Sequence, residues 1–276
     1  ILPCFGSLKL TEITPVKIRE WQNALLSSGD LKATTINQIG QHFSTALNYA
    51  VKFYGLLKNP YTMVGRIRGA KYADMKIWTP EQFQRFLSYI PTENQELRMA
   101  YELLFWTGIR VGELLALTVS DVNLENKKIS ITKTLRRIQG QVVVGTPKTA
   151  KSVREVDLPG FLVADLREYL ATLFHPMKST RIFHWTDPSP LKYHLVRAAS
   201  QAGLGPIRIH DFRHSHASFL IAHSCPITYV SKRLGHENSS ITMSIYAHFY
   251  DGTDRRAVNI MEQYVSSTFE HGVIVE

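Results

Sequence analysis

The sequence predicts a mainly α protein with a small antiparallel β-sheet. Apolar residues recur at helical spacing along much of the chain, as in Ile18, Trp21 and Leu25, which share one helix face. Residues 127–158 instead alternate between apolar and polar side chains, which is typical of strands with one buried face. Hydrophobic residues make up 44% of the 276 residues and aromatic residues 11%, so a wholly disordered chain is excluded.

Residues 1–70 are predicted to form a small helical domain. Thr14-Pro15 supplies an N-cap and a proline at the first helical position. Gly55 and then Asn59-Pro60 end a second helix. That second helix is predicted from apolar residues at helical spacing: Ile36, Ile39, Phe43, Ala46, Ala50 and Phe53.

A second domain, residues 71–276, is predicted to follow a linker at residues 64–72, which holds two glycines and little periodicity. It opens on Thr79-Pro80, where Gln82 can complete a capping box. Helices are then expected at residues 82–90, 96–106 and 111–117, an antiparallel sheet at residues 128–132, 142–144 and 153–158, and further helices from Pro159 almost to the end.

The net charge points to a polyanionic partner. Lys and Arg outnumber Asp and Glu by 32 − 23 = 9, and the sequence pI is about 9.5. Residues 1–70 hold eight Lys and Arg against three acids, which is 8 − 3 = +5, more than half of the excess. This predicts a basic clamp, although a helical bundle with a solvated basic face is the alternative.

Several simple features limit the cellular setting. Cys4 and Cys225 cannot build a disulfide framework and fit a reducing compartment. No run of 18 or more apolar residues is found, which argues against a membrane-spanning helix. The first five residues lack the basic region of a signal peptide, and we expect a segment of a longer protein to precede them.

The most distinctive segment is residues 210–216, His-Asp-Phe-Arg-His-Ser-His. His210 and Arg213 are three residues apart, so on a helix they can converge on one group, and His210 could accept or relay a proton. His210 and His214 are four apart, which raises zinc as an alternative. The metalloprotease pattern needs Glu after the first histidine, where this chain has Asp211, and no third ligand is obvious. Capping and core packing by these histidines is the second alternative.

Four other positions carry chemistry. Arg110 lies at a glycine-flanked helix start, Lys148 at the tip of the predicted β-hairpin, His236 just after Gly235 at a helix end, and Tyr246 on a short helix. Arginine guanidinium groups suit phosphate oxygens, a tyrosine is a covalent nucleophile, and a lysine can protonate a leaving oxygen. No carboxylate pair is apparent that would hold the ions of a metal-dependent nuclease.

The ordered set Arg, Lys, His-x-x-Arg, His and Tyr resembles the tyrosine recombinases of the phage and conjugative-transposon integrase group. Residues 107–114 resemble the first arginine motif of that family, and residues 210–217 resemble its H-x-x-R box. Leu234-Gly235-His236 followed by Tyr246 resembles its C-terminal signature. The resemblance covers nearly all of residues 74–268, and the preceding helical segment is similar to the family's core-binding domain.

The resemblance implies a role for each residue. It makes Tyr246 the nucleophile and Lys148 the general acid, with His210 assisting proton transfer, and it makes Glu113 a support of the site. The residues that bind and activate the scissile phosphate would be Arg110, Arg213 and His236. Lys151 lies three residues from Lys148, so the identity of the acid stays open, with Lys148 preferred.

Further contacts with DNA are expected from Lys32, Arg66, Arg68 and Lys151. The resemblance implies a site-specific recombinase that works through a 3′-phosphotyrosyl intermediate, without ATP, metal or other cofactor, to integrate or excise a prophage or mobile element in the bacterial cytoplasm. Four protomers would act on two double-stranded core sites, with accessory DNA-bending or directionality factors and without an arm-site-binding domain. A helix at residues 253–267 would dock on a neighbour or on its own chain. A type IB topoisomerase-like enzyme and a non-catalytic DNA-binding relative are the alternatives.

Overall fold

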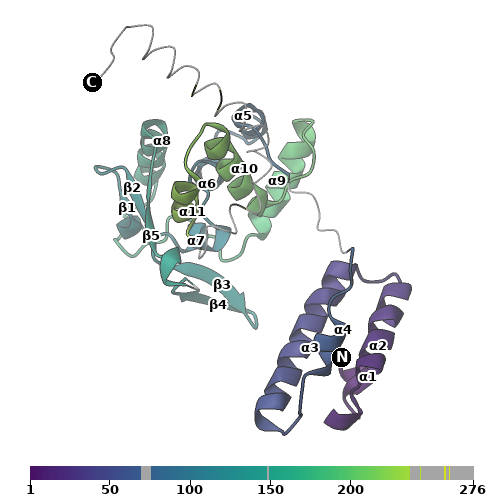
Figure 1. The fold of residues 1–276 in the computed structure, drawn as a ribbon. Coiled ribbons are helices and arrows are strands. Elements are labelled where there is room, and N and C mark those ends of the chain that lie inside the picture. Colours follow the sequence, from purple (N-terminus) through teal and green to yellow (C-terminus); the bar gives the residue numbers. More distant parts are fainter. Residues whose placement is uncertain (70–75, 148, 237–242, 244–257, 259–260, 262–276) are drawn as a thin grey trace, which may run out of the picture. The chain divides into compact units, whose positions relative to one another are not determined.

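The computed structural model describes the chain except for residues 70–75, 148, 237–242, 244–257, 259–260 and 262–276 (Figure 1). The contacts within the chain divide it into two compact units, Ile1–Asp74 and Met75–Glu276. The fold is mainly helical with small antiparallel sheets, which confirms the predicted fold class. Among the described residues, no helix combines the length and the hydrophobicity needed to cross a membrane.

The first unit packs its helices around a small aromatic core. Its elements are α1 (Leu2–Phe5), the 3-10 turn η1 (Leu10–Glu12), α2 (Pro15–Ser27), α3 (Ala33–Phe53) and α4 (Pro60–Val64). The predicted cap at Thr14 is confirmed, since its side-chain oxygen accepts from the backbone N–H of Lys17 at 3.3 Å. Asn59 is predicted to follow the end of the second long helix. It is also the N-cap of α4, since its side chain accepts from the backbone N–H of Tyr61 at 2.9 Å.

The second unit contains most of the helices. These are α5 (Pro80–Leu87), α6 (Gln95–Thr107), α7 (Val111–Ala116), α8 (Gly160–Ala171), α9 (Ser189–Gln201), α10 (Ile209–Ala222) and α11 (Ile227–Leu234), with the 3-10 turns η2 (Val119–Asp121) and η3 (Ala150–Ser152). The capping box of Thr79 and Gln82 is confirmed at the start of α5. The helix predicted at residues 253–267 lies almost entirely outside the described residues.

The β-structure differs from the predicted single sheet. Strands β1 (Val122–Asn123), β2 (Lys128–Ile131) and β5 (Arg154–Asp157) form one antiparallel sheet in the order β1-β2-β5. Strands β3 (Thr134–Ile138) and β4 (Gln141–Gly145) form a separate two-stranded hairpin. All residues of β4 are exposed, so its apolar run of Val142, Val143 and Val144 does not join the half-buried sheet.

Helix α10 is fixed in the middle of the second unit by Phe212. This side chain is fully buried, and its ring lies within about 6 Å of several other rings. Those rings belong to Trp78, Phe83, Phe86, Tyr101 and Phe105. Because Phe212 faces the core, its neighbours Asp211 and Arg213 are held at defined positions at the edge of that core.

Gly40 allows the close approach of α3 to α4 in the first unit. A Cβ atom on Gly40 would overlap the hydroxyl of Tyr61 and lie 2.6 Å from its ring carbon Cζ. The hydroxyl of Tyr61 also accepts from Nε2 of Gln22 at 3.0 Å, so the ring cannot move without breaking a buried hydrogen bond.

We therefore expect Gly40→Ala to destabilise the first unit by about 1–3 kcal/mol, because overpacking outweighs the better helix propensity of alanine. Urea unfolding followed by tryptophan fluorescence and circular dichroism measures the change. Gly160→Ala is the matched control, since nothing lies within 4 Å of its added Cβ. Equal stability of the two variants would contradict this packing argument.

Candidate active site

Arg110 stands at the start of α7 and is held there by Glu113. The carboxylate of Glu113 accepts from the backbone N–H of Arg110 at 2.9 Å and from its Nη1 at 2.8 Å. The side chain of Glu113 is 2% exposed, whereas that of Arg110 is 37% exposed. Arg110 and Arg154 beside it hold the pKa of the Glu113 carboxyl below its usual range, although burial alone would raise it. The predicted pairing of an arginine with a supporting acid is thus present in the geometry.

Arg213 reaches from α10 to two other elements. Its Nη1 donates to the carbonyl of Gly108 at 2.8 Å, and its Nη2 donates to the carbonyl of Leu234 at 2.6 Å. Gly108 ends α6 with a φ of 67°, and a Cβ there would lie 2.8 Å from both His216 and Leu234. Glycine is therefore required at this point for α6, α10 and α11 to meet.

The end of α11 gathers three arginines on three successive carbonyls. Arg154 Nε donates to the carbonyl of Arg233 at 2.7 Å, Arg213 to that of Leu234, and Arg110 Nη2 to that of Gly235 at 3.3 Å. The last carbonyls of a helix lack intrahelical partners and carry partial negative charge, which cations stabilise. Gly235 closes the helix in the left-handed region at φ 66°, as predicted, and His236 follows at once.

His236 and His210 both lie in this cationic surrounding. Loss of solvent contact and the charges of Arg213 and Arg110 lower the pKa of His236 to about 4. Loss of solvent contact, His214 and Arg213 likewise lower the pKa of His210 to about 4, although part of the His210 ring remains exposed. At neutral pH both imidazoles are therefore neutral and can donate one hydrogen bond and accept another.

The remaining polar residues of the segment 210–216 have structural partners. Asp211 is buried and accepts from the backbone N–H of Arg208 at 2.9 Å and from its guanidinium group, which caps α10. Nε2 of His216 accepts from Nε of Arg233 at 3.0 Å in the interior. The rings of His210 and His214 lie 5.1 Å apart, but within the described part of the chain no cluster of three or more His, Cys, Asp or Glu could hold a metal ion.

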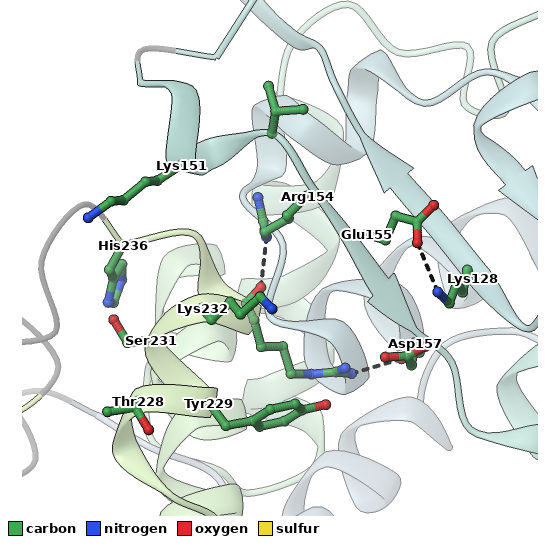
Figure 2. A pocket seen from close by; sticks show the side chains of 12 residues that line it. Lys128, Lys151, Arg154, Glu155, Asp157, Thr228, Tyr229, Ser231, Lys232 and His236 are labelled. Atoms are coloured by element: carbon green, nitrogen blue, oxygen red, sulfur yellow. Dashed lines mark hydrogen bonds and ion pairs between the residues drawn. The ribbon is translucent and has the colours of Figure 1, made fainter.

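A cavity of about 760 Å³ runs from His236 between β5 and α11 (Figure 2). Lys151, expected from the sequence as the alternative general acid, lines this cavity together with His236 and Lys232. Lys148 and Tyr246, expected from the sequence as the general acid and the nucleophile, lie outside the described residues. Of the residues expected to contact DNA, three are exposed in the first unit: Lys32, Arg66 and Arg68.

Arg154 is the residue that the sequence reasoning missed. It lies on β5, and its side chain is 6% exposed. Alternate residues of a strand face the same side, so Arg154 shares the face of the buried Val156. A charged side chain on the buried face of a strand requires a partner of opposite charge or a hydrogen-bond acceptor. The position of Arg154 in the alternating pattern of β5 could therefore have predicted a buried, paired arginine.

The burial of His216 predicts a pH-dependent stability. Burial lowers the pKa of His216 from 6.5 to about 3. Below pH 6.5 the His216 imidazole therefore binds a proton in the unfolded chain but stays neutral in the folded chain. The free energy of unfolding falls as the pH drops from 6.5 toward 4. His216→Gln, whose amide oxygen can still accept from Arg233, should remove about 1.4 kcal/mol per pH unit of this dependence. Urea unfolding at pH 7, 6, 5 and 4.5 measures the slope.

The exposed His42 provides the control, because His42→Gln should keep the slope of the unsubstituted chain. Identical slopes for His216→Gln and the unsubstituted chain would show that His216 does not carry this linkage.

Comparison with known proteins covers almost the whole chain. Residues 76–252 match the phage integrase family, and residues 1–26 match a phage integrase N-terminal SAM-like domain. The chain is 31% identical over 265 residues to the ICEBs1 integrase of Bacillus subtilis (strain 168), spanning 92% of this chain and 72% of that protein. It is 28% identical to the integrase of Staphylococcus phage L54a, spanning 92% and 85%.

The fold is also similar to that of solved integrases. The Tn1549 transposon integrase in complex with transposon right end DNA superposes with a TM-score of 0.79 at 22% identity, covering 93% of this chain and 88% of that one. A lambda integrase tetramer bound to a Holliday junction gives 0.61 at 18% identity, covering 88% and 67%. With its arginine-lined site and these matches, the chain belongs to the phage integrase family of tyrosine recombinases.

Proposed function

We propose that this site-specific recombinase cuts and rejoins DNA at the end of α11, with Tyr246 as the nucleophile. The observation that carries the proposal is the convergence of Arg110, Arg213 and His236 on that helix end. Arg110 remains 37% exposed and can reach an outside ligand with part of its guanidinium group. Two guanidinium groups and a neutral imidazole suit the non-bridging oxygens of a phosphodiester, whose negative charge grows in the transition state.

The reaction needs no net oxidation and no added energy. The oxygen of Tyr246 attacks the scissile phosphorus while the bond to the 5′-oxygen breaks, which leaves a 3′-phosphotyrosyl link. The neutral His210 accepts or relays the tyrosine proton, and Lys148, with Lys151 as the alternative, protonates the departing 5′-oxygen. A 5′-hydroxyl of the partner strand then attacks the phosphotyrosyl link and releases Tyr246.

The two units suit a clamp around duplex DNA. Residues 1–70 would serve as the core-binding domain, with Lys32, Arg66 and Arg68 on phosphates, and residues 71–276 would serve as the catalytic domain. Exposed cations on the first unit and a charge of +5 over its first 70 residues support this division.

Recombination needs two DNA sites and hence several protomers. The lambda integrase tetramer bound to a Holliday junction supports the proposal that four copies of this chain act together. Residues 253–267 would dock on a neighbour in that assembly. The similarity to the integrases of ICEBs1 and phage L54a supports integration of a mobile element or prophage. The proposal also includes excision in a bacterial cytoplasm, with accessory DNA-bending or directionality factors as further partners.

Tyr246→Phe should abolish covalent attachment to DNA and leave binding within about twofold, because phosphate contacts carry the affinity. The DNA sequence of the probe is taken from DNA that crosslinks to the purified chain. The probe is a duplex of that sequence with a nick beside the cleavage site, a suicide substrate that traps the covalent protein–DNA adduct, which is measured on a denaturing gel. We expect a loss of at least about 10³-fold, since no other group replaces the nucleophile. Tyr193→Phe, an exposed tyrosine on α9, is the matched control and should form the adduct normally. Adduct formation by Tyr246→Phe would refute the assignment.

Cleavage of the same suicide duplex should continue in EDTA at a rate within about twofold of the untreated enzyme, because arginines and a lysine supply the charge and the proton. Single-turnover cleavage with and without the chelator measures this. Loss of cleavage in EDTA that Mg²⁺ or Zn²⁺ restores would favour a metal-dependent mechanism instead.

A further inference from the structure

Arg154 is buried in the site and touches three of the segments that build it. Its Nη2 and Nη1 donate to the two carboxylate oxygens of Glu113 at 2.9 and 3.3 Å. Its Nη1 also donates to the carbonyl of Ser152 at 2.9 Å, and its Nε to the carbonyl of Arg233 at 2.7 Å. All three nitrogens of the Arg154 guanidinium group therefore donate to groups within the protein. Figure 2 shows Arg154 above the end of α11.

We propose that Arg154 is a positioning residue of the recombination reaction, which acts through Glu113 on Arg110 and through the end of α11 on His236. The inference rests on the proposed function. Arg154 is 6% exposed, whereas Arg110 is 37% exposed, so Arg110 meets the phosphate and Arg154 acts from behind it.

The first part of this role is electrostatic. Glu113 is buried between the two arginines, and together the three side chains carry a net charge of (+1) + (+1) + (−1) = +1. Without Arg154 the carboxylate would balance Arg110 alone, and the cluster would be neutral toward an approaching phosphate. Arg154 thereby leaves the positive charge of Arg110 available for the substrate.

The second part is geometric. Arg154 joins Ser152, at the end of the turn that carries Lys151, to the carbonyl that lies three residues before His236. A Cβ atom on Gly235 would lie 3.0 Å from Nη1 of Arg154, so the absence of a side chain at Gly235 gives the guanidinium its room. The turn that carries Lys151 and the segment that leads to His236 are thus both hydrogen-bonded to the guanidinium group of Arg154.

The experiment measures single-turnover cleavage of the suicide duplex, DNA affinity and thermal stability. Arg154→Gln should slow cleavage by about 10- to 100-fold, as for other groups that orient a reactive residue from behind. Arg154→Lys keeps the positive charge but loses the planar guanidinium group. Its cleavage rate should lie between those of Arg154→Gln and the unsubstituted chain. Arg98→Gln is the matched control, because Arg98 also donates to two carbonyls, those of Leu87 and Ile90, but does so away from the site.

The double variant Glu113→Gln with Arg154→Gln separates positioning from mere structural support. It restores the net charge of +1 on Arg110, so it should cleave about tenfold faster than Arg154→Gln alone. If Arg154→Gln does not fold, the double variant, which has no uncompensated buried carboxylate, is compared with the unsubstituted chain. Cleavage by the double variant within about tenfold of the unsubstituted rate then supports the proposal.

Cleavage by Arg154→Gln at the unsubstituted rate overturns the proposal, as does a double variant no faster than a folded Arg154→Gln. Where Arg154→Gln does not fold, a double variant more than about 100-fold slower than the unsubstituted chain also overturns it. Failure of the unsubstituted chain to form any covalent adduct would instead refute the proposed function.

Discussion

The site depends on one buried negative charge, the carboxylate of Glu113 between Arg110 and Arg154. A carboxylate that is 2% exposed is stable in its charged form only when it is paired and hydrogen-bonded. It accepts from the backbone and side chain of Arg110 and from both terminal nitrogens of Arg154. Removing one partner of such a group costs about 3–5 kcal/mol, so the carboxylate keeps both arginines in place. Their remaining donors reach the end of α11 and fix the start of the segment that carries His236.

The electrostatics of the site follow from this arrangement. Arg110, Arg154 and Arg213 lie close together and repel one another, and Glu113 and the carbonyls at the end of α11 offset part of that repulsion. Arginine keeps its proton under all relevant conditions, whereas histidine can give its proton up. The nearby histidines therefore become neutral, and the arginines alone supply permanent positive charge. A site of this kind holds its cations in place before the phosphate arrives, which avoids reorganisation during the reaction.

Sequence reasoning succeeded where the signal was local. The cap at Thr14, the capping box at Thr79 and the end of α11 at Gly235 each depend on a few neighbouring residues. It failed for the valines of β4, which pair with the preceding strand β3 in a mostly exposed hairpin, because an apolar run does not show which strand it pairs with or whether it is buried. It also missed Arg154, whose partner Glu113 lies 41 residues earlier in the chain. The roles expected for Lys148 and Tyr246 came from a resemblance to a family rather than from local physics.

The histidine-rich start of α10 shows why spacing alone left zinc open as an alternative. Residues at i and i+4 share a helix face, so His210 and His214 could in principle hold one ion. The neighbouring polar residues have structural roles, since Asp211 caps the helix with Arg208 and His216 accepts from Arg233 in the interior. Phe212, between them, anchors the helix in the aromatic core. The same short segment therefore builds the anchor of α10 on one side and presents His210 beside the arginine cluster on the other. A helix held so firmly by its inner residues can keep the His210 imidazole in register with Arg110, just before α7, and with His236, just after α11.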